Sequence, residues 1–235
     1  MKILVVAAHP DDEILGMGGT ILKHRKKGDT VRVIFLATGI TSRRTTTYKN
    51  SPKYEINESE TKTIKSEIKS LRKNATSALK LLKVNDINFY NFPDNEMDTV
   101  SLLQIVKTIE NEISTFKPNV VYTHHRNDLN IDHQISYHAT LTACRPINKQ
   151  IEIISFEVPS STEWNYPVIF NPNYFVNISK ELTQKINALK MYKNEIKKFP
   201  HTRSAKYLKI NAEKWGSVSY NEASEAFEII RKYEK

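Results

Sequence analysis

The chain contains very little cysteine. Among its 235 residues only Cys144 carries a thiol, so no disulfide can form within the chain. No apolar run approaches the roughly 20 residues of a membrane-spanning helix, and no basic segment precedes a cleavable apolar stretch at the amino terminus. These absences favour the reducing cytoplasm as the compartment, and we expect no membrane span.

The charge of the chain lacks the features of a nucleic-acid binder. There are 35 Lys and Arg against 26 Asp and Glu, which gives a net charge of +9. The cations are mostly lysines spread over predicted helices, without an arginine-rich cluster among aromatics and without zinc-finger spacing. We interpret the charge as a solvated surface and expect no nucleic-acid partner.

Internal repeats and low-complexity tracts are also absent, and strand-like runs alternate with helical patterns. Such alternation predicts an α/β fold, Rossmann-like, with a mostly parallel sheet and helices on both faces. We expect one domain over residues 1–235, with a Rossmann-like core at 1–146. The predicted strands are 3–7, 31–37, 87–90 and 120–122, and the predicted helices are 15–27, 61–82, 100–116 and 133–144.

The pattern changes after Pro146, where residues 147–235 are expected to complete the domain as a mixed α/β part. We predict strands at 151–157 and 174–178, a loop at 159–172, and helices at 181–197, 204–214 and 221–233. The apolar residues Phe227, Ile229 and Ile230 of the last helix are assigned to the core, with a homo-oligomer interface as the alternative.

Two polar clusters follow central strands. His9-Pro10-Asp11-Asp12-Glu13 comes directly after an apolar run at 3–8, and residues 123–133 follow the fourth strand. Because α/β sheets bind ligands beyond the carboxyl ends of their strands, we expect both clusters to border one pocket. Two histidines and a carboxylate are common ligands of catalytic zinc, and His9, Asp12 and His133 fit best. Asp11 is then free to act as a general base.

Two other interpretations compete with a metal site. His9 and Asp12 could simply cap the first helix, since acids are favoured there, but capping does not explain the second cluster. Paired acids after a first strand also occur in phosphoryl-accepting receiver modules. Those modules need an Asp and a Lys after other central strands, whereas this chain has Thr38 and His124 at such positions.

The hexapeptide Ala8-His9-Pro10-Asp11-Asp12-Glu13 together with Asp132-His133 resembles the LmbE-like, or PIG-L, zinc-dependent N-deacetylases. The resemblance extends through residues 92–95, 143–146, 160–164 and 201–204. It implies that His9, Asp12 and His133 bind zinc, that Asp11 is the general base, and that an N-acetyl group is hydrolysed from an N-acetylglucosamine-type amino sugar. Asp132 would orient a histidine.

One position departs from the family pattern. Several members carry a histidine three residues before the last zinc ligand, where it stabilises the oxyanion or protonates the leaving amine, whereas this chain has Asn130. Asparagine can donate a hydrogen bond but cannot supply a proton. His124 or His125 is an alternative proton donor, and so is Asp11 if it returns the proton it accepts.

The resemblance also suggests substrate contacts at predicted loops and element ends. These are Arg43, Arg44, Arg72, Asp94, Trp164 and Arg203. Alternatives to a sugar N-deacetylase are an amidase on a thiol-sugar conjugate or another acylated amine, and a catalytically idle sugar-binding protein. Fe²⁺, Co²⁺ or Mn²⁺ are alternatives to Zn²⁺ at the same ligands.

Overall fold

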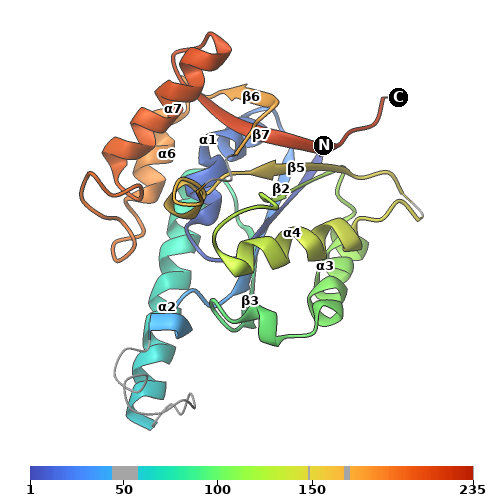
Figure 1. The fold of residues 1–235 in the computed structure, drawn as a ribbon, viewed down its shortest axis with the longest axis vertical. Helices are drawn as coiled ribbons and strands as arrows, with labels where there is room; N and C mark the ends of the chain where they lie inside the picture. Colours follow the sequence, from blue (N-terminus) through green and yellow to red (C-terminus); the bar gives the residue numbers. More distant parts are fainter. Residues whose placement is uncertain (44–57, 148, 167–169, 235) are drawn as a thin grey trace.

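The computed structural model describes residues 1–43, 58–147, 149–166 and 170–234. They form one α/β domain around a sheet with the strand order β3-β2-β1-β4-β5-β7-β6 (Figure 1). The strands are β1 (Lys2–Ala7), β2 (Thr30–Ala37), β3 (Asp86–Phe92), β4 (Val120–His124), β5 (Glu152–Phe156), β6 (Tyr174–Asn177) and β7 (Ser224–Arg231). The helices are α1 (Asp12–Lys26), α2 (Glu58–Leu81), α3 (Leu102–Phe116), α4 (Ile131–Ala143), α5 (Pro159–Thr162), α6 (Leu182–Leu189) and α7 (Ala205–Ser219), with short 3-10 helices η1 (Thr41–Arg43) and η2 (Met97–Thr99).

Strand β1 lies between β2 and β4 and is parallel to both. The chain runs from β1 to β2 on one side and later enters β4 on the other side of β1, so the connections that follow β1 and β4 diverge and open a crevice beyond the carboxyl ends of these strands. Strands β3 and β5 extend the parallel part of the sheet, whereas β7 is antiparallel to β5 and to β6. The predicted Rossmann-like, mostly parallel sheet is confirmed.

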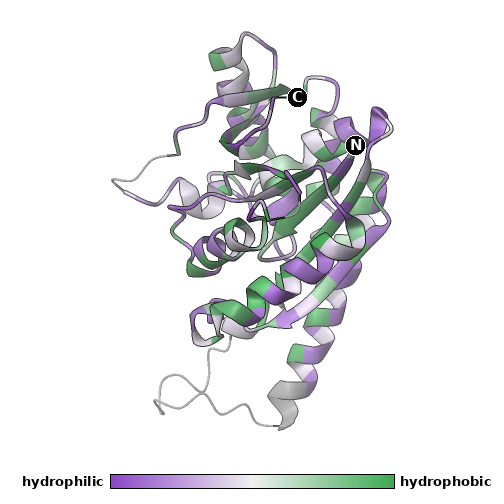
Figure 2. Cartoon of the chain, turned by 90° about the vertical axis from the view of Figure 1, so that its right-hand side faces the viewer, coloured by the Kyte–Doolittle hydropathy of each residue, from purple (hydrophilic) through white to green (hydrophobic). Residues whose placement is uncertain are grey.

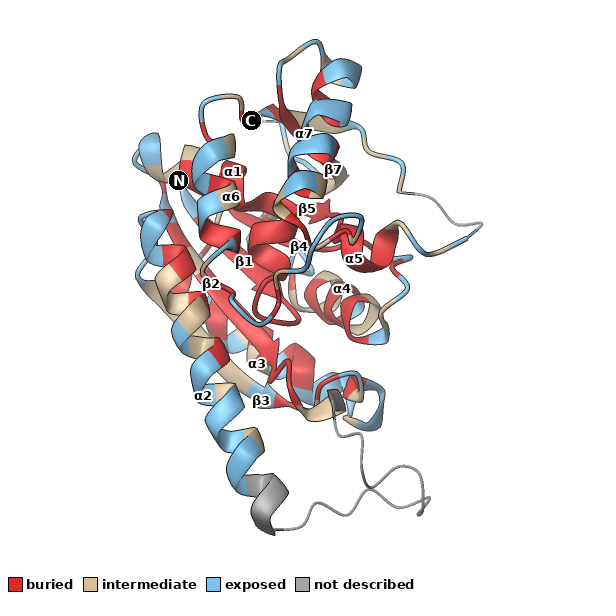
Figure 3. Ribbon diagram, turned by 90° about the vertical axis from the view of Figure 1, so that its left-hand side faces the viewer, coloured by how far each residue is buried: buried red, intermediate tan, exposed pale blue. Residues whose placement is uncertain are grey.

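Both faces of the sheet are covered because the strands are apolar on both sides. Ile3 and Val5 of β1 pack with residues of α1, α2 and α6, while Leu4 and Val6 pack against α3 and α4. Figure 2 shows apolar strands flanked by helices with one polar face, and Figure 3 shows the same strands buried and the outer face of α2 exposed. No described helix is long and apolar enough to cross a membrane.

The first helix packs closely against the sheet because its second turn contains glycines. A Cβ atom on Gly16 would lie 2.4 Å from Cδ2 of Phe156 and 2.7 Å from the carbonyl oxygen of Glu157. A Cβ atom on Gly19 would lie 2.8 Å from Ile178. The glycine run therefore serves packing between α1 and the sheet.

The carboxy-terminal part differs from the sequence prediction. The predicted helix at 221–233 is wrong, because its central residues form β7 between β5 and β6. The predicted helix at 181–197 is shorter, ending at Leu189, and the predicted loop begins with the short helix α5. Phe227 is fully buried in β7. Homo-oligomerisation stays a prediction, which light scattering can test.

Candidate active site

The first cluster lies where β1 ends and α1 begins. Asp11 occupies the N-cap position of α1, but its side chain makes no capping hydrogen bond. Asp12 accepts the backbone N–H of His9 at its Oδ2 atom over 2.8 Å, which leaves Oδ1 buried and without a partner. Helix capping therefore does not account for these two carboxylates.

His9 is held in one tautomer by two carboxylates. Its Nε2 atom lies 2.9 Å from Oδ2 of Asp132 and 3.0 Å from Oδ1 of Asp94, so this nitrogen carries the proton and donates. Asp132 is fixed in turn by the backbone N–H groups of Asn95 and Met97. The other nitrogen, Nδ1, faces Oδ2 of Asp12 at 3.4 Å.

His133, in the first turn of α4, is oriented by Asp128. The Nδ1 atom of His133 lies 3.1 Å from Oδ2 of Asp128 and 3.4 Å from Oγ of Ser161 in α5. Its Nε2 atom lies 3.3 Å from Oδ2 of Asp12 and has no hydrogen-bond partner. Both histidines thus direct their second ring nitrogen toward the same carboxylate.

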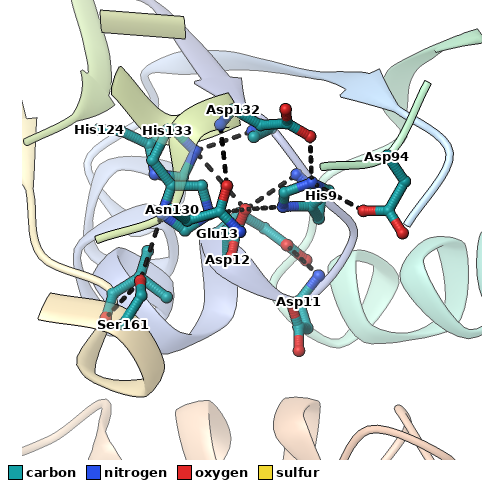
Figure 4. Close-up of polar contacts among 12 residues, drawn as sticks. His9, Asp11, Asp12, Glu13, Asp94, His124, Asn130, Asp132, His133 and Ser161 are labelled. Atoms are coloured by element: carbon teal, nitrogen blue, oxygen red, sulfur yellow. Dashed lines mark hydrogen bonds and ion pairs between the residues drawn. The ribbon is translucent and has the colours of Figure 1, made fainter. Parts of the chain in front are cut away.

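His9, Asp12 and His133 converge into a group that fits a divalent metal. Their ligand atoms all lie within 4.8 Å of one another, and Figure 4 shows Asp12 between the two histidines. Two ligands about 2.1 Å from a tetrahedral ion are roughly 3.4 Å apart, close to the separations of 3.3 and 3.4 Å found here. Buried nitrogen and oxygen atoms without partners are costly unless a cation or proton satisfies them.

The pKa values around this group reflect the same electrostatics. Burial alone would lower the pKa of His133, but Asp12 and Asp128 raise it to about 9. Burial alone would raise the pKa of Asp12, but His133 and His9 hold it well below its usual range. Carboxylates that favour a proton on a histidine also favour a cation there, and a metal would displace that proton.

Asp11 has a strained backbone and a distinct environment. Its φ of 120° lies in the region that favours glycine, a conformation that costs on the order of 1–3 kcal/mol for other residues. Its N–H donates to Oε2 of Glu13, and the hydroxyl of Tyr192 donates to the other carboxylate oxygen, Oε1, at 2.5 Å. The conformation gives adjacent carboxylates different surroundings, with Asp12 facing the histidines and Asp11 facing Arg203.

The Asp11 carboxyl faces a cavity with Oδ2 buried and without a hydrogen-bond partner. The Nε atom of Arg203 lies 3.5 Å from this oxygen. Burial raises the pKa of Asp11 to about 7, although Arg203 opposes the shift. A carboxyl with such a pKa can both accept and release a proton near neutrality.

The cavity has a volume of about 150 Å³ and is lined almost entirely by polar residues. Besides His9 and Asp11, it brings together the predicted contacts Asp94 and Arg203 and also Asn130. Burial alone would raise the pKa of Asp94, but hydrogen bonds from His9 and Ser42 lower it to about 2. The remaining lining residues are Pro10, Gly39, Ser42, Asn95 and Glu195.

Other predicted site residues lie away from this cavity. His124 stacks on the His133 ring at 3.9 Å between centroids, and its Nε2 accepts the N–H of Ala8. Burial holds the pKa of His124 well below its usual range, so it is neutral. His125 points instead toward Glu228 of β7, at 3.2 Å. Neither histidine lines the cavity, and neither is placed to protonate a leaving amine there.

The arginines and Trp164 are placed differently from one another. Arg72 donates to the carbonyl of Tyr90 and the side chain of Asn91, so it braces β3 and does not line the cavity. Trp164 is half exposed with its ring against His201. Arg43 ends η1, and its side chain and all of Arg44 lie outside the described residues.

Sequence reasoning did not single out several residues that support the site. Asp128 lies within the predicted second cluster but received no role, although it orients His133. Asn130, singled out from the sequence as a departure from the family pattern, also has a structural role: its side chain caps α4 by accepting the N–H of Asp132, and it donates to Asn95. Glu195 lies far from both motifs in sequence and reaches the cavity through its ion pair with Arg203.

Fold and site together define an α/β protein with a candidate metal centre at the carboxyl edge of a parallel sheet. The family model described as "PIG-L: GlcNAc-PI de-N-acetylase" matches residues 4–144. The uncharacterized deacetylase YaiS of Escherichia coli K12 is 30% identical over 199 residues, which cover 82% of this chain and 90% of that protein. The chain therefore belongs to the PIG-L family of deacetylases.

Solved structures share the fold. The N,N'-diacetylchitobiose deacetylase of Pyrococcus horikoshii has a TM-score of 0.71 at 20% identity, covering 97% of this chain and 83% of that one. GalB, a 4-carboxy-2-hydroxymuconate hydratase of Pseudomonas putida KT2440, has a TM-score of 0.73 at 19% identity, covering 100% and 98%. Because a deacetylase and a hydratase share this fold, the fold alone does not define the reaction.

Proposed function

We propose that this protein is a metal-dependent N-deacetylase that removes the acetyl group from an N-acetylglucosamine-type amino sugar. The observation that carries the proposal is the convergence of His9, Asp12 and His133 beside the buried carboxyl of Asp11. His9 through Nδ1, Asp12 through its carboxylate and His133 through Nε2 would hold Zn²⁺, or another divalent metal. Such an ion supplies Lewis acidity, which polarises an amide carbonyl and lowers the pKa of water to about 7.

Asp11 would accept the proton of the attacking water. Its Oδ2 atom faces the cavity without a hydrogen-bond partner, and its pKa of about 7 matches a general base that works near neutrality. Arg203 stabilises the ionised form from 3.5 Å. Amide hydrolysis also needs a proton on the leaving nitrogen. Because Asn130 cannot supply it and His124 and His125 lie outside the cavity, Asp11 would return the proton it accepted.

The polar lining of the cavity supports a sugar substrate. For sugar hydroxyl groups, the Asp94 carboxylate offers hydrogen-bond acceptors, the Asn130 amide offers both an acceptor and donors, and Arg203 offers donors. The names of the PIG-L family model and of the chitobiose deacetylase both contain an acetylated sugar, and YaiS is described as a deacetylase. An amidase acting on another acylated amine would use the same catalytic groups, so the acyl group and the amine must be tested separately.

Acetate release tests the proposal. We would load purified protein with Zn²⁺, strip a second sample with a chelator, and supply both with a panel of N-acetylglucosamine derivatives. Release from the loaded sample alone is the expected result, and N-propionyl and N-butyryl analogues then rank the acyl group. If the protein binds one zinc per chain but releases acetate from no acylated amine, the proposed deacetylase activity is contradicted and a sugar-binding protein is favoured.

A further inference from the structure

A second cavity adjoins the catalytic one. It has a volume of about 310 Å³ and lies between α2 and the segment that follows α6. Small-molecule sites typically measure about 300–1,000 Å³. The catalytic cavity, at about 150 Å³, is smaller than this range, whereas the second cavity falls within it. Its lining residues are Ile40, Glu67, Leu71, Asn74, Asn194 and Glu195.

The two cavities meet at Glu195, which lines both. Gly39 lines the catalytic cavity and the next residue, Ile40, lines the second. From the reaction centre outward, Asp11 contacts Arg203 at 3.5 Å, and Arg203 donates to Oε2 of Glu195 at 3.1 Å. A ligand that extends past the Arg203–Glu195 ion pair would thus enter the second cavity.

The lining of the second cavity has the character of a site for a neutral sugar. Ile40 and Leu71 are buried and form an apolar floor. The side chains of Glu67, Asn74 and Asn194 make no hydrogen bond or ion pair with other described parts of the chain, so their carboxylate and amide groups are available. Sugar rings combine apolar faces with hydroxyls that donate and accept.

The charges in the cavity argue against an anionic ligand. Its two ionisable lining residues, Glu67 and Glu195, are both carboxylic acids, and no lining residue is a lysine or arginine. The Glu67 carboxylate would repel the diphosphate of a nucleotide-linked sugar, whereas it would accept hydrogen bonds from the hydroxyl groups of a neutral sugar.

We propose that this second cavity is a subsite for a neutral sugar unit joined glycosidically to the acetylated one, so that the substrate is a disaccharide or longer. The inference rests on the proposed function, because it takes the catalytic cavity as the place of the acetylated unit. The adjoining unit would pack on Ile40 and Leu71 and bond to Asn74 and Asn194.

The test measures binding apart from turnover. The Asp11→Asn variant would be titrated calorimetrically with N-acetylglucosamine, with its β-1,4-linked disaccharide, and with uridine-diphosphate N-acetylglucosamine. We expect the disaccharide to bind at least ten-fold more tightly than either of the others. Adding Asn74→Ala and Asn194→Ala should remove most of that advantage, whereas Asn187→Ala, an exposed asparagine on α6, should leave it unchanged.

Equal affinity for the monosaccharide and the disaccharide would overturn the subsite, and so would an advantage that survives both asparagine substitutions. Acetate release from the wild-type protein is measured in parallel. Tight disaccharide binding without acetate release would contradict the deacetylase function and support the subsite. Acetate release together with equal affinity for monosaccharide and disaccharide would support the deacetylase function and contradict the subsite.

Discussion

The Oδ2 atom of Asp128 lies 3.1 Å from Nδ1 of His133, and this contact directs the opposite nitrogen of the ring toward Asp12. Burial alone would raise the pKa of Asp128, but His133 and neighbouring hydrogen bonds lower it to about 2. Asp128 is therefore ionised at neutral pH and fixes both the tautomer and the direction of the imidazole. Asp132 does the same for His9 from the other side of the cluster.

Replacing Asp128 with asparagine should weaken metal binding. Loss of a carboxylate behind a ligating histidine typically costs 10–100-fold in metal affinity, and we expect Asp128→Asn to fall in that range. Competition with a zinc chelator measures the effect. Asp98→Asn, at an exposed aspartate of η2, is the matched control. Unchanged affinity in Asp128→Asn would contradict the role assigned to this residue.

Alanine at Gly16 should destabilise the fold. The added Cβ would lie 2.4 Å from the Phe156 ring and 2.7 Å from a backbone oxygen, so strand and helix must separate. Overpacking of this kind costs about 1–3 kcal/mol, which urea denaturation measures. Gly28→Asn is the control, because a Cβ there meets no atom within 4 Å and asparagine tolerates the positive φ of 84°. Equal stability of the two variants would count against close packing at α1.

Removing the charge of Glu157 should stabilise the protein at neutral and alkaline pH. Burial raises its pKa above the ordinary 4.5, despite hydrogen bonds from Asn211 and Trp215. A raised folded-state pKa contributes stability that is fully present below about pH 4.5 and is lost as the pH rises through the folded value. Glutamine keeps an acceptor for both donors and carries no charge.

Urea unfolding at pH 4 and pH 8 checks this expectation. Glu157→Gln should exceed wild type in unfolding free energy at pH 8 and match it at pH 4. Glu222→Gln, at an exposed glutamate, should show no such difference between the two pH values. The same gain at both pH values for Glu157→Gln would contradict a raised pKa.

The parallel half of the fold follows from local patterns in the sequence. Residues 3–8 are apolar throughout because β1 is buried on both faces, and the polar clusters after β1 and β4 meet because parallel strands end at one edge. These two facts were sufficient to predict the grouping of His9, Asp12 and His133. That prediction needed no knowledge of the carboxy-terminal part.

The carboxy-terminal part was harder to predict because tertiary pairing overrides local preference there. Ala223, Phe227 and Ile230 recur at a helical spacing, and alanine and glutamate favour helices. The segment nevertheless pairs with β5 and β6, a contact between chain regions that no local pattern encodes. Glu195 and Arg203 border the cavity for the same reason: their position depends on how this part folds back over α1.

The assignment of Asp11 as the proton acceptor is the central claim, and one variant tests it most directly. Asp11→Asn keeps the size of the side chain and removes its basicity, so we expect acetate release to fall by about 10²–10⁴-fold. Bound metal, measured on the same sample, should stay at the wild-type level because His9, Asp12 and His133 are intact. Full acetate release by Asp11→Asn with its metal retained would contradict the account.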